Sequence, residues 1–142
     1  MGATLVVVVN KTLTLSSSQR RQLIDITDQV VNCVEASGVG EGICTISAPH
    51  ATAAIIINEH ESGLARDILS KIDELFPQTS RYAHNAIDDN ADAHLAAAFL
   101  GHSKMFPVTK RKVVRGTWQN VFVVELDGPR SRREVHIQVF GE

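Results

Sequence analysis

The order in which strand-like and helix-like segments follow one another limits the possible folds of this chain more than any other feature. From residue 105 onward, four strand-like segments follow one another with no helical pattern between them. They cover residues 105–108, 112–114, 119–126 and 133–140. A doubly wound parallel sheet needs a helix between successive strands. We therefore expect an α+β fold, with a mainly antiparallel, β-sandwich-like sheet and helices packed on one side.

The preceding residues alternate between short apolar runs and amphipathic stretches. Apolar residues three and four positions apart predict helices, glycine and proline predict where helices end, and serine or asparagine predicts where they begin. The expected strands are 4–9, 42–47 and 53–58, with a turn at Asn10-Lys11. The expected helices are one from the serines at 16–18 to Gly38, one with a buried stripe of Leu64, Ile68, Leu69, Ile72 and Leu75 that ends at Pro77, and one over 91–100 capped by Asn90.

Length and composition set broad limits on the kind of protein. A chain of 142 residues suits one domain over 1–142. A net charge of −2 disfavours a general nucleic-acid partner. The apolar run at 5–9 is far too short for a membrane span and lacks the flanks of a signal peptide. Cys33 and Cys44 lie in apolar surroundings, which is typical of reduced thiols and favours a cytoplasmic protein without a membrane partner.

Three of the six histidines lie where elements end or loops run, which is where scaffolds present functional side chains. They are His50, His84 and His94. Neutral imidazoles bind zinc and similar divalent ions, and three of them leave a coordination position open. No two of them form a local ligand pair, so spacing alone leaves open that each one caps a turn. Carboxylates that could serve as ligands or bases are Glu59, Asp88, Asp89, Asp92, Glu125 and Asp127.

The remaining candidate side chains have simpler interpretations beside functional ones. His60, His102 and His136 fit solvated or helix-end positions. Arg130 follows an Asp-Gly-Pro turn, and its guanidinium could bind a phosphate or pair with Asp127 or Glu125. Trp118, the only tryptophan, is expected to anchor the core or a subunit interface.

Five segments in this order together resemble the YjbQ-like family. They are His50-Ala51-Thr52-Ala53-Ala54 with Asn58-Glu59, Tyr82-Ala83-His84-Asn85, Asn90-Ala91-Asp92-Ala93-His94-Leu95, Gly116-Thr117-Trp118-Gln119, and Glu125-Leu126-Asp127-Gly128-Pro129-Arg130. The resemblance implies a compact α+β fold with a β-sandwich-like sheet, assembly as a homotrimer, and a pocket of three histidines that can hold a divalent metal ion such as zinc. It also implies a secondary thiamine-phosphate synthase activity.

Carried over by position, the resemblance assigns a role to each of seven residues. His50, His84 and His94 are the expected metal ligands, Glu59 and Asp127 the expected catalytic groups, and Asn90 and Arg130 the expected substrate-binding groups. The chain departs from the family pattern at Ala51, Phe106, Arg111 and Arg115. Arginine at 111, where glycine is usual, predicts a rebuilt hairpin turn, since a side chain disfavours positive φ.

Three functions remain open on this basis. The first is a metal-binding enzyme that acts on a small phosphorylated metabolite. The second is a module that binds such a metabolite without turnover. The third is an adaptor for nucleic acid or protein that uses the basic residues at 110–115, although the net charge disfavours it.

Overall fold

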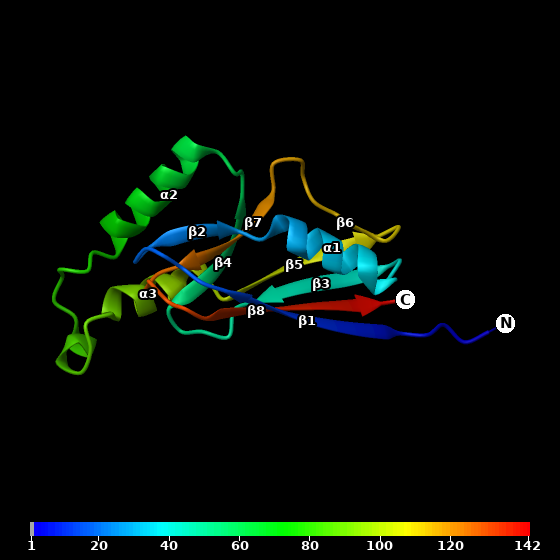
Figure 1. The fold of residues 1–142 in the computed structure, drawn as a ribbon, viewed down its shortest axis with the longest axis horizontal. Helices are drawn as coiled ribbons and strands as arrows, with labels where there is room; N and C mark the ends of the chain where they lie inside the picture. The colour runs from blue at the N-terminus through cyan, green and yellow to red at the C-terminus, as the bar shows by residue number, and fades with distance from the viewer. Residues whose placement is uncertain (1) are drawn as a thin grey trace.

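The computed structural model describes residues 2–142, which form two antiparallel sheets with three α-helices and a short 3₁₀ helix (Figure 1). The strands are β1 (Val7–Leu15), β2 (Gln22–Asp25), β3 (Gly42–Ser47), β4 (Ala53–Asn58), β5 (Ser103–Thr109), β6 (Lys112–Val113), β7 (Asn120–Glu125) and β8 (Arg133–Gly141). The helices are α1 (Thr27–Ser37), α2 (Ser62–Leu75), η1 (Ala83–Ala86) and α3 (Ala91–Leu100). The expected α+β class with antiparallel pairing is confirmed.

The two sheets divide the strands into a group of five and a group of three. The larger sheet has the order β1-β8-β3-β5-β6 and curls into a half-barrel, and the smaller has the order β2-β7-β4. Strand β8 pairs with β1 over nine residues and with β3 on its other side. Its strict alternation turns Val135, Ile137 and Val139 toward the interior, as the sequence predicts.

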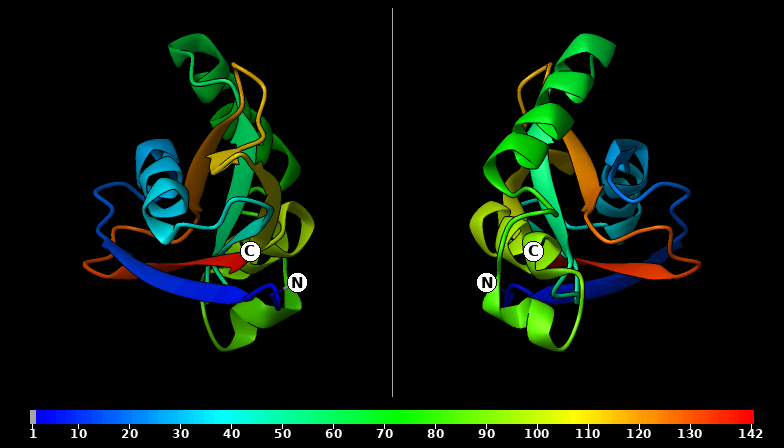
Figure 2. Two further views of the ribbon diagram at one scale, coloured as in Figure 1. Left: turned by 90° about the vertical axis from the view of Figure 1, so that its right-hand side faces the viewer. Right: turned by 90° about the vertical axis from the view of Figure 1, so that its left-hand side faces the viewer.

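The smaller sheet separates two hydrophobic cores. Between the sheets, Ile55 and Val123 pack with Val30 and Val34 of α1. On the opposite face, residues of β4 and β7 pack with Ile72 of α2 and the alanines of α3, whose small side chains allow a close approach. Figure 2 shows α1 on one side of β4 and β7, and α2 and α3 on the other. Strand β7 is therefore buried on both faces.

Two predictions for the N-terminal segment were wrong. The first strand runs straight through Asn10-Lys11, because pairing with β8 replaces the expected turn and the Asn10 side chain accepts a hydrogen bond from Gln138. The expected helix from 16–18 begins only at Thr27, and β2 precedes it, paired with β7. The carboxylate of Asp25 accepts from the backbone N–H of Thr27 and so marks the change from strand to helix.

Two smaller predictions were also wrong, and a third was wrong in one of its two alternatives. Leu75 is 62% exposed, since the last turn of α2 extends beyond the core and Ile72 is the buried member of the stripe. Trp118 is 69% exposed, so it does not anchor the core, and the expected subunit interface stays a prediction. Arg111 adopts φ 65° and Lys110 φ 50°, so the hairpin keeps a turn with positive φ at both central residues and is not rebuilt. None of the helices within residues 2–142 combines the length and apolarity that crossing a membrane requires.

Candidate functional site

Side chains from three separate segments meet where α3 begins. The His84 cluster, as we name it, consists of His84 from η1, Asn90 and His94 at the start of α3, and Asp127 and Arg130 from the β7–β8 connection. The amide nitrogen of Asn90 donates to Asp127 Oδ2 at 2.9 Å. The amide oxygen of Asn90 lies 3.1 Å from His84 Nε2. Asn90 was expected to cap α3, but its side chain makes no cap hydrogen bond and joins His84 to Asp127 instead.

The turn that carries Asp127 and Arg130 is held by the segment before β2. A Cβ atom on Gly128 would lie 2.1 Å from the carbonyl oxygen of Gln19, so this close approach requires glycine. The hydroxyl of Ser17 accepts from the backbone N–H of Arg130 at 2.9 Å. The backbone of the turn is therefore clamped on both sides.

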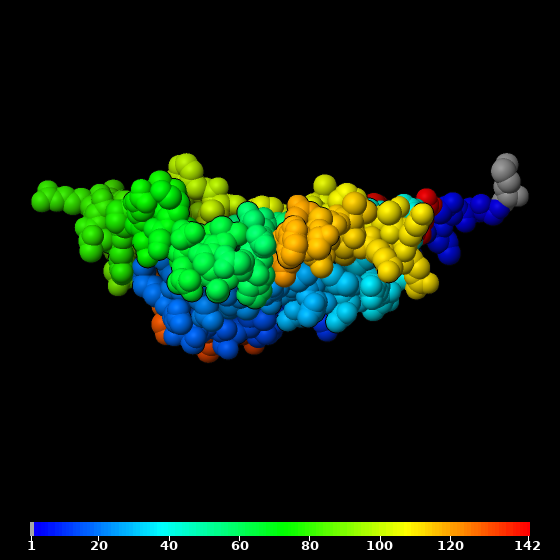
Figure 3. All heavy atoms as spheres, turned by 90° about the horizontal axis from the view of Figure 1, so that it is seen from above, coloured from blue at the N-terminus to red at the C-terminus, as the bar shows by residue number. Residues whose placement is uncertain are grey.

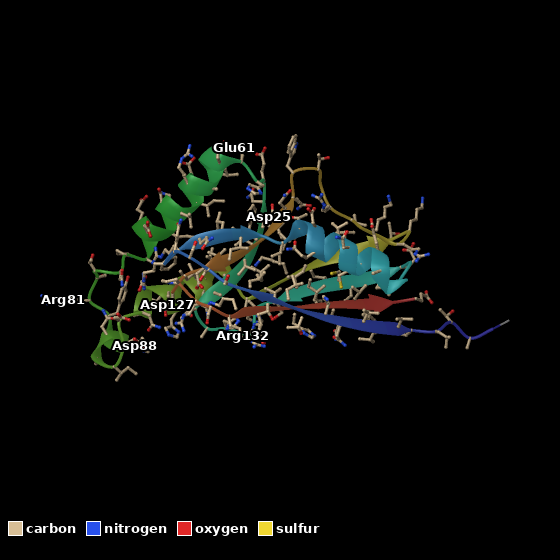
Figure 4. The ribbon with its side chains drawn as sticks, viewed as in Figure 1. Asp25, Glu61, Arg81, Asp88, Asp127 and Arg132 are labelled. Atoms are coloured by element: carbon tan, nitrogen blue, oxygen red, sulfur yellow. The ribbon has the colours of Figure 1, made fainter. Side chains whose placement is uncertain are left out.

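Arg130 forms the ion pair that the sequence offered as one alternative, and it remains open to solvent. Its terminal nitrogen donates to Asp127 Oδ2 at 2.8 Å, and its Nε donates to the Asp127 carbonyl oxygen at 2.9 Å. The side chain is 47% exposed. Figure 4 shows Asp127 at the end of the molecule that holds α3. The guanidinium can thus still offer donors to an incoming anion.

A buried carboxylate lies beneath this turn. Asp92 is 1% exposed and accepts hydrogen bonds from Arg20 and Arg21, and Arg20 also approaches Asp127 Oδ1 at 3.7 Å. Burial alone would raise the pKa of Asp92, but the hydrogen bonds from the two arginines outweigh it and lower the pKa. Arg20 and Arg21 could not be identified from the sequence, because they lie 71 or 72 residues from Asp92 and no local pattern connects them.

His84 and His94 form an edge-to-face pair, with ring centroids 4.8 Å apart and planes at 73°. Both rings line a hollow of about 460 Å³, the His84 hollow, with Tyr82 and Leu95 on its walls. The His94 ring is half-buried and lines the hollow that it shares with His84, so it can contact a ligand there.

His50 lies on the other side of His94. The two rings line a second hollow of about 280 Å³, the His50 hollow, together with His102 and small alanine side chains. His50 Nε2 accepts from the backbone N–H of Glu134 at 2.8 Å. Burial, and then the nearby positive charge of Arg133, hold the pKa of His50 below its usual range. Because Nε2 accepts this hydrogen bond, it carries no proton, and the imidazole is neutral.

The expected metal ligands do not form one compact triad within a single chain. His94 is shared by the two hollows, with His84 on one side and His50 on the other. Within residues 2–142, no group of three or more His, Cys, Asp or Glu side chains is arranged to hold a metal ion. The chemistry of the His84–His94 pair does fit a divalent ion that prefers imidazole. A third protein ligand is not supplied by the described residues.

Glu59 stands apart from the other expected site residues. Glu59 directly follows strand β4, whereas His50 lies in the loop before it. A six-residue strand is about 20 Å long at 3.3 Å per residue, and this length separates the two side chains. At that far end, His60 Nδ1 lies 2.6 Å from Asp25 Oδ2. Figure 3 shows the start of α2 beside the segment that leads into β7, which carries Trp118. Glu59 therefore belongs to a different part of the surface from the His84 cluster.

Comparison with known proteins places this architecture in a family. A family model described as "UPF0047 protein YjbQ-like" matches residues 11–142. The chain belongs to the YjbQ-like UPF0047 family. A UPF0047 protein of Archaeoglobus fulgidus is 46% identical over 123 residues, which cover 87% of this chain and 95% of the relative. One of Methanothermobacter thermautotrophicus is 46% identical over 135 residues, which cover 95% of this chain and 94% of the relative.

Solved structures agree with this assignment. A crystal structure of a protein of unknown function from Sulfolobus solfataricus superimposes with a TM-score of 0.96 at 51% identity, covering 97% of the YjbQ-like chain and 100% of the other. A hypothetical protein of Aeropyrum pernix gives a TM-score of 0.91 at 36% identity, with 94% and 99% covered. These proteins share the fold and family of the chain, and their descriptions name no activity.

Proposed function

We propose that the YjbQ-like chain is a small-molecule enzyme that binds a phosphorylated metabolite at the His84 cluster. The observation that carries this proposal is the unbroken series of contacts from Arg130 through Asp127 and Asn90 to His84. The series joins a half-exposed guanidinium, which suits a phosphate, to an imidazole that faces a hollow. An anion binder and a proton acceptor thus lie within one connected group.

The roles within the cluster follow from the contacts. Arg130 would hold the phosphate, since its fork of donors suits two oxygens at once. Asn90 would keep His84 oriented, because its amide is itself fixed by Asp127. Asp127 already accepts from Asn90 and Arg130, which makes it a positioning group more than a proton acceptor. Glu59 remains a proposed catalytic position by family resemblance only.

A divalent ion, with zinc the best match for imidazole ligands, is proposed at His84 and His94, with substrate or water completing its coordination. When bound, such an ion would stabilise negative charge on a substrate oxygen. The family resemblance suggests a thiamine-phosphate synthase-type transfer as a secondary activity. The principal substrate would be another phosphorylated metabolite.

Replacing Arg130 by lysine tests the phosphate site. Arg130→Lys keeps the positive charge but loses the bidentate fork, so the Kd for inorganic phosphate should rise about tenfold, which is about 1.4 kcal/mol. Isothermal titration calorimetry measures this. Arg132→Lys is the matched control, because Arg132 lies two residues away and pairs with Glu134 at the surface. Unchanged phosphate binding with a lower Tm would make Arg130 a structural ion pair only.

A binding module without turnover is the alternative, and assays of the same variants separate it from an enzyme. In an enzyme, His84→Gln should lower kcat for the thiamine-phosphate synthase reaction while phosphate affinity changes little. A binding module would show affinity for phosphate and no turnover in the parent protein. Glu59→Gln adds a test of the distant family position, since a fall in kcat would require Glu59 to reach the site.

A further inference from the structure

The hydrogen bond to His50 determines where its proton lies. Strand β3 ends at Ser47, opposite His136 of β8, so the backbone N–H of Glu134 has no β3 partner. His50 Nε2 takes that place and accepts from it at 2.8 Å. A nitrogen that accepts cannot carry a proton, and a neutral imidazole carries one. The proton of His50 is therefore on Nδ1.

The Nδ1–H group of His50 is available to a ligand. Among the described residues it has no hydrogen-bond partner, and the only buried polar side-chain atom without a partner is Arg21 Nε. His50 Nδ1 therefore reaches solvent, and its ring lines the His50 hollow. The other walls are alanines and two further imidazoles, and no carboxylate lines this hollow. The Nδ1–H group can donate to an anionic oxygen there, and the two further imidazoles provide other possible donors.

His84 carries a proton on Nε2 instead of Nδ1, because of the groups that its neighbours present. The Asp127 carboxylate only accepts, so the Asn90 amide nitrogen faces it and the amide oxygen faces His84. That oxygen also only accepts, so His84 Nε2 must donate and carry the proton. In the neutral ring the lone pair of His84 is then on Nδ1, where it can bind a metal ion or take a proton.

We infer that the three family histidines divide between two tasks: His50 is the N–H donor of an oxyanion subsite in the His50 hollow, and His84 and His94 alone offer lone pairs to a metal ion. The subsite takes a phosphate oxygen of the metabolite, a statement that rests on the proposed function. For His50 to ligate a metal ion as a neutral group, it would have to release the Glu134 N–H. That step would leave a backbone donor of β8 without its partner.

Nuclear magnetic resonance of protein labelled with ¹⁵N in its histidines tests this division directly. In the free protein, long-range ¹H–¹⁵N correlations should show His50 as the Nδ1–H tautomer and His84 as the Nε2–H tautomer. Inorganic phosphate should shift the His50 Nδ1 resonance. Zinc chloride should shift His84 and His94 and leave His50 in its tautomer. An Nε2–H tautomer of His50 in the free protein would overturn the inference without any ligand.

A matched variant separates donor from acceptor at the same position. The side-chain oxygen of His50→Gln can still accept from Glu134, but the variant has no group in place of Nδ1–H. The Kd of this variant for phosphate should rise about tenfold. Zinc raises Tm because it binds the folded state alone, and this rise should equal that of the parent. His84→Gln should show the reverse, and His136→Gln, on the outer face of β8, should change neither.

The outcomes distinguish this inference from the proposed function. If His50→Gln abolishes the zinc-dependent rise in Tm, His50 is a ligand and the inference fails, while the proposed site stands. If phosphate shifts no histidine and Arg130→Lys binds as the parent does, the proposed function fails and the phosphate subsite fails with it. In a His50→Gln variant that does not fold, the spectra of the parent protein still decide the question.

Discussion

The buried pair of Glu125 and Arg133 connects three parts of the chain that the site depends on. Glu125 is fully buried at the end of β7, and Arg133 is 4% exposed at the start of β8. The Arg133 guanidinium also donates to the carbonyl and hydroxyl oxygens of Thr52 at 3.0 Å, in the loop that carries His50. Ser17, which clamps the turn of Arg130, donates to Glu125 at 2.6 Å. One ion pair thus helps to hold both the loop of His50 and the turn of Arg130.

Replacing Glu125 by glutamine should destabilise the fold strongly. Glu125→Gln retains the shape but leaves the Arg133 charge buried without its partner, which typically costs about 3–5 kcal/mol. Urea denaturation at pH 7 measures this loss. Glu134→Gln, which removes the surface partner of Arg132, should cost less than about 1 kcal/mol. Equal losses in the two variants would contradict the role assigned to the buried pair.

The same carboxylate should make stability depend on pH. Burial alone would raise the pKa of Glu125, but the hydrogen bonds from Arg133 and Ser17 outweigh it, so the pKa lies below its ordinary value. A carboxylate with a lowered folded pKa stabilises the fold fully above its unfolded pKa, about 4.3. This contribution is lost as pH falls through the lower folded pKa. The parent should therefore lose stability below about pH 4 more steeply than Glu125→Gln.

Single residues were the hardest features to predict from sequence. The histidines at element ends stood out because of their positions, and His84 and His94 do meet. The partners that orient them did not stand out, because Asn90 looked like a helix cap and Glu125 like any carboxylate. Their roles depend on contacts between residues far apart in the chain, such as Arg133 and Thr52, which are 81 positions apart. Local patterns carry no information about such contacts.

At the scale of elements, sequence patterns predicted helices and strands correctly where the local pattern fits only one kind of element. The strict alternation of β8 and the start signal at Asn90 predicted β8 and α3 closely. Leu23 and Ile24 fit a helical or an extended pattern equally well, and pairing with β7 decided in favour of β2. The end of β1 likewise depends on nine paired residues of β8, which override a local turn signal.

The β5–β6 hairpin offers a test at this scale. Both central residues, Lys110 and Arg111, have positive φ, as in a type I′ turn. Glycine adopts that conformation without steric cost, but it also gives the unfolded chain more conformational freedom, which offsets part of the gain. Arg111→Gly should therefore stabilise the fold by a net amount of about 0.5–1 kcal/mol. Calorimetry should show a Tm rise of about 2–4 °C. Lys112→Gly, within β6 where φ is not positive, should lower Tm instead.

At the scale of the whole molecule, the homotrimer implied by family resemblance stays a prediction. The apolar residues at 121–124 are buried inside the chain and leave no surface there for a subunit contact. Exposed apolar side chains lie instead on the outer face of the larger sheet, where Val8, Phe140 and Ile43 occupy paired positions on adjacent strands. This face presents the kind of surface that a second copy would cover.

Light scattering at micromolar concentration tests the assembly. We expect about three chain masses of 15.5 kDa each, since closed symmetric oligomers are the common pattern. Phe140→Lys should shift the mass toward one chain, because a buried charge opposes the contact. Phe99→Lys, at an exposed position on α3, is the control. A parent protein that stays at one chain mass at every concentration tested would contradict the trimer.

Trp118 has a practical consequence for all of these measurements. It is the only indole in the chain, and most of its side chain is exposed to solvent. Its fluorescence should already be red-shifted in the native protein, and it should be quenched readily by iodide. Emission will therefore report poorly on unfolding, which circular dichroism should follow instead. The emission of Trp118 should also change when a binding partner covers the segment before β7. The protein therefore contains an intrinsic fluorescent probe for contacts made there.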